Sequence, residues 1–223
     1  MSVAPADYLA AIEHLPAGAV LRFDDVPWED YENLLADLGE GYAVRIFYDN
    51  GRMEVMAPAS THEKPKSVIH TLVTAIRDEL DIDIESLGST TLKKEIKAAG
   101  AEPDDCFYVQ NAVLVIGRED LNLQNDPAPD LVVEIDRTSS ALDRFAIYAA
   151  LGVPEIWRLA RRQLRIYLLV GDRYEESPIS SVFPFLPATT LSEFVARGLK
   201  EGERKVARAF RDWVREHHPR END

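Results

Sequence analysis

The stretch Pro129-Asp130-Leu131-Val132-Val133-Glu134-Ile135-Asp136 decides how this chain folds. Most of it is a short run of branched apolar residues, which is typical of a β-strand buried on both faces. Glu134 interrupts that run with a carboxylate, and a buried charge is costly unless something compensates it. The compensation can come from a basic side chain or from a metal ion, and the residues leave both open at this point.

A second acidic stretch lies upstream and has the same design. Glu102-Pro103-Asp104-Asp105 leads directly into the β-prone run Cys106–Val109. Two such strands side by side would form an acidic, oxygen-rich cluster. Hard divalent cations, above all Mg²⁺, are bound in proteins by one or two carboxylates together with waters and substrate phosphates. The alternative for Asp104 is simple turn chemistry beside Pro103.

Length and composition favour one globular domain with peripheral additions. The chain has 223 residues, of which 46% are hydrophobic and 29% charged, and these values argue against disordered and fibrous classes. No apolar run is long enough to span a bilayer, and Met1–Asp7 lacks the basic start and apolar centre of a signal peptide. A single cysteine, Cys106, cannot form an intramolecular disulfide. We therefore expect a cytoplasmic protein without membrane association and with Cys106 in its core.

The charge balance bears on the class of partner. A formal net charge of −14 argues against a generic nucleic-acid binder, since such binding depends on Lys and Arg neutralising phosphates. It does not exclude a local basic face. Such a face, or merely solvated surface, could be formed by the basic residues of the central and later chain: Lys93, Lys94, Lys97, Arg137, Arg144, Arg158, Arg161, Arg162 and Arg165.

Periodicity and turn signals predict the elements around the first acidic stretch. Asp49-Asn50-Gly51 between alternating apolar residues is a strong β-hairpin signal. Apolar residues at helical spacing from Val68 to Leu80 predict a long amphipathic helix with Thr61 as its N-cap. The expected helices are 7–14, 28–38 and 61–80, and the expected strands are 20–23, 42–48, 52–56, 82–85, 90–96 and 105–109.

The strand Leu131–Asp136 is followed by signals for a crossover helix and further strands. Thr138-Ser139-Ser140 offers N-caps for a helix over 141–151, which Gly152 and Pro154 end. Strands at 155–159, 163–170 and 173–176 and a helix at 203–217 complete the pattern. This order predicts an α/β fold, with helices packed on a mixed β-sheet. We expect an N-terminal helical extension at 1–40, a core at 41–180 and a C-terminal helical tail at 181–223.

Three linked motifs give the chain a resemblance to a known family. They are Gly-Ala-Glu-Pro-Asp-Asp-Cys-Phe-Tyr-Val at Gly100–Val109, Pro-Asp-Leu-Val-Val-Glu-Ile-Asp at Pro129–Asp136, and Tyr-Ala-Ala-Leu-Gly-Val-Pro-Glu-Ile-Trp at Tyr148–Trp157. Together with the predicted hairpin and His62-Glu63, they resemble the Uma-two family of the PD-(D/E)XK, or restriction-endonuclease-like, superfamily. The resemblance covers about residues 41–174 and implies a restriction-endonuclease-like core.

The resemblance also implies roles for individual residues. An Asp and a Glu on neighbouring strands bind Mg²⁺ in that superfamily, and by motif these are Asp104 and Glu134. A metal held by two carboxylates lowers the pKa of a bound water and offsets charge on a phosphodiester. Mn²⁺ could replace Mg²⁺. The backbone carbonyl of Ile135 is a further candidate ligand, and Glu63 or Glu54 could complete the set.

The chain departs from the superfamily pattern where a Lys is expected. Two residues after Glu134 it has Asp136. Many family members carry the Lys on the following helix, four residues before the Tyr, and this chain has Arg144 there. A guanidinium binds phosphate well but stays protonated, so it cannot act as a general base. Asp136 and Arg144 are therefore catalytic candidates, and we expect activity to be weak, altered or absent.

Simpler structural roles are open for the same residues. Glu134 could be ion-paired with Arg144 in the core. Asp136 and Asp143 could be carboxylates favoured by a helix N-terminus. His62 could be a cap or a surface group, and Trp157 is expected to be a packing anchor.

Three functions are compatible with these observations. The first is a Mg²⁺-dependent endonuclease that hydrolyses DNA phosphodiester bonds through a metal-activated water, with a homodimer as the default oligomer. The second is a non-catalytic binding or assembly protein that keeps the nuclease fold. The third is a hydrolase for a small phosphoester. A fold alone does not decide among them, and we take the first as the working hypothesis.

Overall fold

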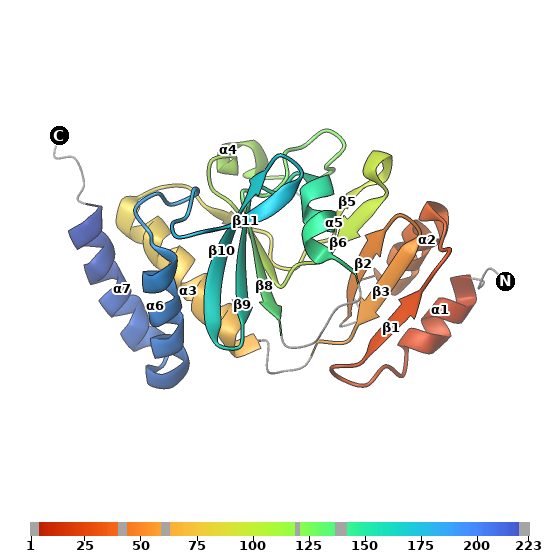
Figure 1. The fold of residues 1–223 in the computed structure, drawn as a ribbon, viewed down its shortest axis with the longest axis horizontal. Coiled ribbons are helices and arrows are strands. Elements are labelled where there is room, and N and C mark those ends of the chain that lie inside the picture. The colour runs from red at the N-terminus through yellow and green to blue at the C-terminus, as the bar shows by residue number, and fades with distance from the viewer. Residues whose placement is uncertain (1–4, 40–43, 59–62, 119–120, 137–141, 219–223) are drawn as a thin grey trace.

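The computed structural model describes residues 5–39, 44–58, 63–118, 121–136 and 142–218. They form two β-sheets flanked by helices, which confirms the α/β class (Figure 1). The first elements are α1 (Pro5–Ile12), β1 (Val20–Phe23), α2 (Trp28–Leu38), β2 (Arg45–Asp49), β3 (Arg52–Met56), α3 (Glu63–Leu80), β4 (Glu85–Ser86), β5 (Leu92–Lys94), the 3₁₀ helix η3 (Glu95–Lys97) and β6 (Ala99–Ala101). The later ones are β7 (Asp105–Tyr108), α4 (Ala112–Val115), β8 (Leu131–Asp136), α5 (Arg144–Leu151), β9 (Glu155–Ala160), β10 (Gln163–Val170), β11 (Arg173–Ser177), α6 (Ala188–Glu201) and α7 (Glu203–His217).

The smaller sheet has the order β1-β3-β2-β6-β5 and is antiparallel throughout. Its centre is the predicted hairpin, whose turn places Asn50 and Gly51 at φ angles of 48° and 84°. Both angles are positive, which explains why the turn uses Asn and Gly. Because β1 pairs with β3, the N-terminal segment expected as a helical extension also supplies an edge strand.

The chain passes from the smaller to the larger sheet at Glu102-Pro103-Asp104. Pro103 has no backbone N–H and cannot continue a ladder of hydrogen bonds, so β6 ends before it and β7 begins after it. Glu102 anchors this crossing, because its carboxylate accepts from the Ile46 N–H at 2.9 Å and from the Thr91 hydroxyl at 2.7 Å. The chain therefore forms two sheets, of which the larger, with one parallel pair, is the mixed sheet that the residue pattern predicted.

The larger sheet has the order β11-β10-β9-β8-β7-β4 and places β8 near its middle. β8 runs antiparallel to β7 and parallel to β9, and all other neighbours are antiparallel. A parallel pair needs a crossover connection, and α5 supplies it. The quoted stretch thus forms the buried central strand that its composition predicts.

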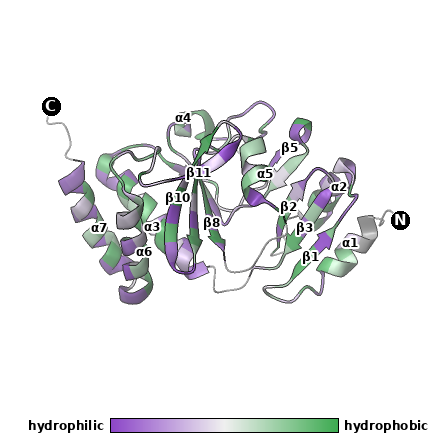
Figure 2. Cartoon of the chain, in the orientation of Figure 1, coloured by the Kyte–Doolittle hydropathy of each residue, from purple (hydrophilic) through white to green (hydrophobic). Residues whose placement is uncertain are grey.

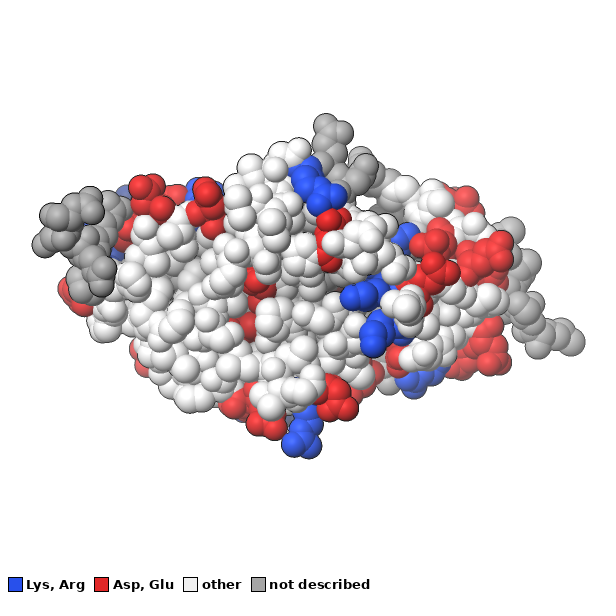
Figure 3. Space-filling model, turned by 90° about the horizontal axis from the view of Figure 1, so that it is seen from above, with Lys and Arg blue, Asp and Glu red and all other residues white. Residues whose placement is uncertain are grey.

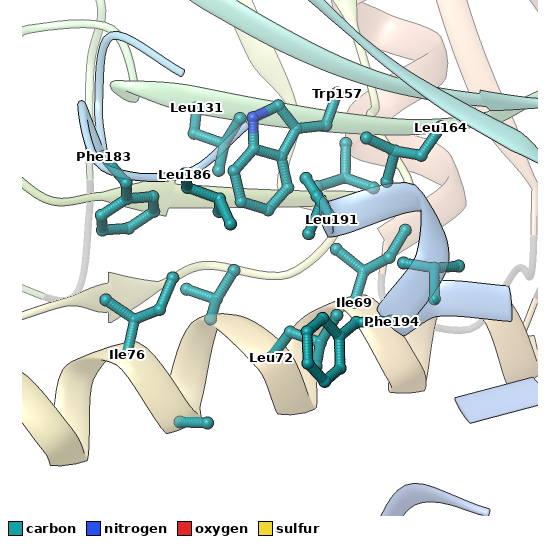
Figure 4. Packing of buried hydrophobic residues seen from close by; sticks show 14 of the residues in the cluster. Ile69, Leu72, Ile76, Leu131, Trp157, Leu164, Phe183, Leu186, Leu191 and Phe194 are labelled. Atoms are coloured by element: carbon teal, nitrogen blue, oxygen red, sulfur yellow. The ribbon is translucent and has the colours of Figure 1, made fainter. Parts of the chain in front are cut away.

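The side chains of β8 alternate between two cores. Leu131, Val133 and Ile135 face a core formed with α3, α6 and α7. Figure 4 shows how Ile69, Leu72 and Ile76 of α3 lie beneath Trp157, Leu131 and Leu164 of the sheet, with Phe183, Leu186, Leu191 and Phe194 around them. Val132 faces a second core with Cys106, Tyr148 and Ile147. Since strand side chains alternate, Glu134 lies on this second face, toward α5.

Hydropathy follows this layering. Figure 2 shows α7 with hydrophilic and hydrophobic residues interspersed along its length. The buried residues of α7 are Val206, Phe210 and Val214, which recur every four positions and form one stripe. Within the described residues, no helix combines the length and the apolar character required to cross a membrane.

Several predicted elements differ from the structure in extent. The strand expected at 90–96 is shorter, because Lys94 ends β5 and η3 follows. The strand expected at 82–85 is displaced to Glu85–Ser86. The predicted helix starts at 61 and 141 lie outside the described residues, where α3 is described from Glu63 and α5 begins at Arg144. β6, α4 and α6 were not predicted as elements, although α6 follows Pro187, which is a helix-start signal.

Candidate active site

The candidate site is built on two carboxylates that face each other across neighbouring strands. Asp105 of β7 pairs with Val133 of β8, so the next step of the antiparallel register brings Asp104 beside Glu134. Directly opposed residues of an antiparallel pair share one face of the sheet. Both side chains are buried, and Asp104 Oδ2 accepts a hydrogen bond from the Ile135 backbone N–H at 2.7 Å. The strand pairing thus fixes the acidic pair that the sequence predicted.

Glu134 is held by two side chains from α5. Arg144 Nη1 donates to Glu134 Oε2 at 2.8 Å, and the Tyr148 hydroxyl donates to Oε1. Arg144 and Tyr148 are four residues apart on the helix, so they lie on one face and reach the same carboxylate. The ion pair that the sequence left as an alternative is therefore present.

The surroundings of Glu134 raise its pKa to about 6. Burial is the largest cause, because it disfavours the charged form, and the nearby Asp104 charge acts in the same direction. The Arg144 charge and the two hydrogen bonds oppose the rise. Two carboxylates in a buried space repel each other, and an added cation would relieve this repulsion.

Arg144 lies in a cradle formed by the smaller sheet. Its guanidinium stacks over the Phe47 ring at 4.0 Å from the centroid and contacts Met56 Sδ at 3.6 Å. Its Nη2 lies 3.9 Å from Glu54 Oε1, and only 14% of its side chain is exposed. Asp143 caps α5 by accepting from the Phe145 and Ala146 N–H groups, which confirms its predicted helix-flanking role. Arg144 therefore bridges carboxylates from both sheets.

A cavity of about 290 Å³ opens beside this cluster. Its polar lining includes Glu134, Asp136 and Arg158, and the full lining is Glu134, Asp136, Leu142, Asp143, Arg144, Phe145 and Arg158. Asp136 forms an ion pair with Arg158 of β9. Asp136 stands where the superfamily pattern has Lys, and it is thus paired with an arginine from the neighbouring strand.

The donor set suits a hard divalent cation. Glu54, Asp104 and Glu134 are buried carboxylates; the partly buried Arg144 pairs with Glu134 and lies near Glu54, and the half-exposed Arg22 lies 3.4 Å from Glu54. Across the part of the chain that the structure describes, no three acidic, histidine or cysteine side chains converge on a metal position. A metal here would rest on the Asp104 and Glu134 pair with waters, as Mg²⁺ commonly does.

The structure brings most of the predicted site residues together. Asp104, Glu134, Ile135, Asp136 and Arg144 gather at the end of β8. Glu54 joins them through Arg144, whereas Glu63 is exposed at the start of α3 and His62 lies outside the described residues. The role of Tyr148 as a partner of Glu134 was missed, and its four-residue spacing from Arg144 was the signal that could have revealed it.

Two residues outside the site behave as the sequence predicts. Trp157 is fully buried and donates its Nε1–H to Glu155 at 2.6 Å, so it is a packing anchor. Cys106 is also fully buried and free of disulfides.

Opposed buried carboxylates thus lie at the ends of adjacent strands of an α/β protein, with a crossover helix beside them. A family model described as "Uma2: Putative restriction endonuclease" matches residues 28–200. The chain belongs to this family.

No curated protein matches the chain. Among solved structures, the chain is similar to a crystal structure described as "a putative nuclease belonging to DUF820" from Anabaena variabilis ATCC 29413. The TM-score is 0.46 at 16% sequence identity, and the match covers 67% of this chain and 90% of the other.

Proposed function

We propose that this chain is a DNA endonuclease that uses Mg²⁺ or Mn²⁺ bound by Asp104 and Glu134, with the backbone carbonyl of Ile135 as a further ligand. The observation that carries the proposal is the buried carboxylate pair fixed by the β7–β8 register. Membership of a family described as "Putative restriction endonuclease" supports the reaction class. A bound divalent cation would lower the pKa of a water and offset charge on the phosphodiester.

The protein's own groups would position this chemistry. Hydrolysis forms a bond between a water oxygen and phosphorus, breaks one bridging P–O bond and protonates the departing oxygen. Arg144 is suited to bind the non-bridging phosphate oxygens, because its planar guanidinium presents several donors. Tyr148 fixes the orientation of Glu134 through its hydrogen bond. Arg144 stays protonated, so it cannot accept the proton of the water.

A second candidate function has a specific observation in its favour. Arg144 already compensates Glu134 at 2.8 Å, and no lysine stands in its place. Such an arrangement would also suit a protein that keeps the fold for binding or assembly without catalysis. This candidate predicts no hydrolysis of any nucleic acid in Mg²⁺ or Mn²⁺.

Calorimetric titration of Mg²⁺ and Mn²⁺ into the wild-type chain and into Glu134→Gln tests the first proposal. The same samples are then incubated with supercoiled plasmid. Asp172→Asn, in the exposed turn after β10, is the matched control because it removes one carboxylate away from the site. We expect the wild type and the control to bind metal and nick plasmid, and Glu134→Gln to lose both.

Two outcomes would count against this proposal. Metal binding that is equal in all three proteins would remove Glu134 as a ligand. Folded wild-type protein that neither binds metal nor nicks DNA would favour the non-catalytic candidate. Thermal unfolding of each variant separates a lost ligand from a lost fold.

A further inference from the structure

An unusual turn lies at the end of the sheet next to the candidate site. Arg161 and Arg162 form the two-residue connection between β9 and β10, because Ala160 pairs directly with Gln163. Their φ angles are 50° and 68°. Two-residue hairpin turns with both φ angles positive strongly prefer Asn-Gly, and a long side chain is strained there. Strain of this kind is concentrated at functional positions.

The two arginines line a depression of about 760 Å³. Its other lining residues come from the ends of β8, β9 and α6, and together the lining is Ile135, Asp136, Leu159, Arg161, Arg162, Ala196, Leu199 and Lys200. Among the described lining residues Asp136 supplies the single carboxylate, and Arg158 pairs with it. Nearby Glu201 is paired with Arg197 at 3.4 Å. The depression therefore carries three basic groups over an apolar floor.

These three basic groups have no acidic partner among the described residues. Arg161, Arg162 and Lys200 are exposed, and the ion pairs of the described chain do not include them. Two other members of the basic set named from the sequence do have acidic partners, since Lys93 pairs with Glu32 at 2.6 Å and Arg165 with Glu176 at 3.5 Å. The chain has a net charge of −14, so a group of cations without acidic partners among the described residues is unusual in it. Such a group would attract an anionic ligand.

The depression adjoins the candidate active site. Asp136 lines both cavities, and Ile135 in the depression directly follows Glu134 in the site. In Figure 1 the end of β8, the β9–β10 turn and the end of α6 lie along the lower edge of the molecule. The face seen from above in Figure 3 is a different one, where acidic side chains gather over the end that holds the smaller sheet.

We propose that Arg161, Arg162 and Lys200 bind the phosphate backbone of duplex DNA beside the bond that is cleaved. This inference rests on the proposed function for the identity of its ligand. Charge complementarity selects this ligand, since a duplex carries a regular row of phosphates that could contact this surface and Arg144 together. In this proposal the strained turn serves to present two adjacent guanidinium groups at the edge of the sheet.

The test separates binding from turn geometry. Arg161→Asn/Arg162→Gly removes both charges and installs the preferred turn residues, so the melting temperature should rise by about 2–4 °C. Affinity for a fluorescein-labelled duplex is measured by anisotropy in EDTA over about 50 to 200 mM salt. We expect the dissociation constant at about 100 mM salt to rise at least tenfold, and the slope of log affinity against log salt to shrink by roughly two. Lys200→Gln should show about half of this change in slope.

Arg204→Gln/Arg208→Gln is the matched control, because it removes the same charge from exposed positions on α7. An equal loss of affinity in the control would overturn the inference, as would an unchanged affinity of the turn variant or a wild type that binds no duplex. Binding that depends on the turn, without any cleavage in Mg²⁺, would support the inference and reject the endonuclease proposal. Cleavage in Mg²⁺, with an affinity for DNA that does not depend on the turn, would support the endonuclease proposal and reject this inference.

Discussion

Arg144 occupies the position at which the family resemblance leads us to expect a lysine. Its guanidinium is stacked on Phe47 and shared between Glu134 and Glu54. Such a group is suited to a planar, bidentate contact with phosphate, but it does not exchange a proton near neutral pH. The proposed reaction would therefore lack one contribution that a lysine can make.

Replacing Arg144 by lysine should increase the rate of cleavage. An ammonium group can give up its proton, and general acid–base assistance contributes about 10²–10⁴-fold in rate, so we expect Arg144→Lys to nick plasmid at least tenfold faster than the wild type at mildly alkaline pH. Loss of the stacked guanidinium should lower the free energy of unfolding by about 1 kcal/mol. Rates of plasmid nicking and denaturant unfolding measure the two effects.

Arg158→Lys is the control for this change, because Arg158 lines the same cavity and pairs with Asp136. It should leave the rate within about threefold of the wild type, which corresponds to less than 1 kcal/mol. An Arg144→Lys protein that is slower than the wild type would show that the guanidinium itself serves the reaction.

At the scale of residues, the sequence predicted the acids better than their partners. Asp104 and Glu134 were identifiable because each places a carboxylate at or within a run that is otherwise apolar, and that conflict is visible without a structure. The hydrogen bond from Tyr148 was harder to predict: its spacing from Arg144 places both residues on one helix face, but an aromatic residue on a helix facing a sheet is most simply explained by packing. Its contact depends on how α5 is rotated over β8, which is a tertiary property.

At the scale of elements, close helix packing depends on Gly198 of α6. A Cβ atom at this position would lie 2.5 Å from Val68 Cγ1 of α3 and 3.1 Å from Val206 Cγ1 of α7. Both valines are fully buried. The absence of a side chain therefore allows three helices to meet beneath the larger sheet.

Substitution of Gly198 by alanine should destabilise the chain even though alanine favours helices. Overpacking costs about 1–3 kcal/mol, which exceeds the gain of up to about 1 kcal/mol in helix propensity. Denaturant unfolding of Gly198→Ala measures the net loss. The double variant Val68→Ala/Gly198→Ala should lose less than the sum of the two single changes, because the shorter side chain makes room. A Gly198→Ala protein as stable as the wild type would show that the helices shift at little cost.

Elements were predictable where local signals are strong and independent of packing. The hairpin at Asn50-Gly51 and the helix α3 have such signals, and both were expected. α6 was overlooked although its buried residues Leu191, Phe194 and Val195 have helical spacing. The loop before it is held by Glu155, whose carboxylate accepts from the Ser180 and Ser181 hydroxyls and from two backbone N–H groups. No local pattern predicts so distant an anchor.

At the scale of the whole molecule, Glu134 makes stability depend on pH. Its pKa is about 6 in the folded chain and returns to its ordinary 4.5 on unfolding. The folded state therefore binds the Glu134 proton more tightly than the unfolded state does. The stability gained from this binding is fully present below pH 4.5 and is lost as the pH rises through 6. The difference corresponds to about 2 kcal/mol.

Unfolding of the wild type and of Glu134→Gln should reveal this dependence. Between pH 4.5 and 7 the wild type should lose about 2 kcal/mol relative to the variant, because every other titrating group is common to both proteins. Urea unfolding at intervals across this range provides the measurement. A difference that is constant with pH would show that Glu134 titrates at its ordinary value in the folded chain.

The arrangement of two sheets was the part of the fold that the sequence did not predict. By composition alone, β6 and β7 could belong to the same sheet. The division at Pro103 depends on which neighbours the strands find, with β2 and β5 on one side and β4 and β8 on the other. Pairing between distant segments is a property of the assembled chain, whereas the α/β class follows from the order of its parts.

The crossover unit β8–α5–β9 also has an evolutionary consequence. Among its described residues it contains Glu134 with the partners Arg144 and Tyr148, and Asp136 with Arg158, whereas Asp104, Glu54 and the aromatic contact Phe47 are encoded elsewhere. Exchange of this one segment between related genes would transfer the acid and the groups tuned to it as a single inherited block. Divergence of the chemistry could then occur by recombination, without a matching series of point substitutions across the chain.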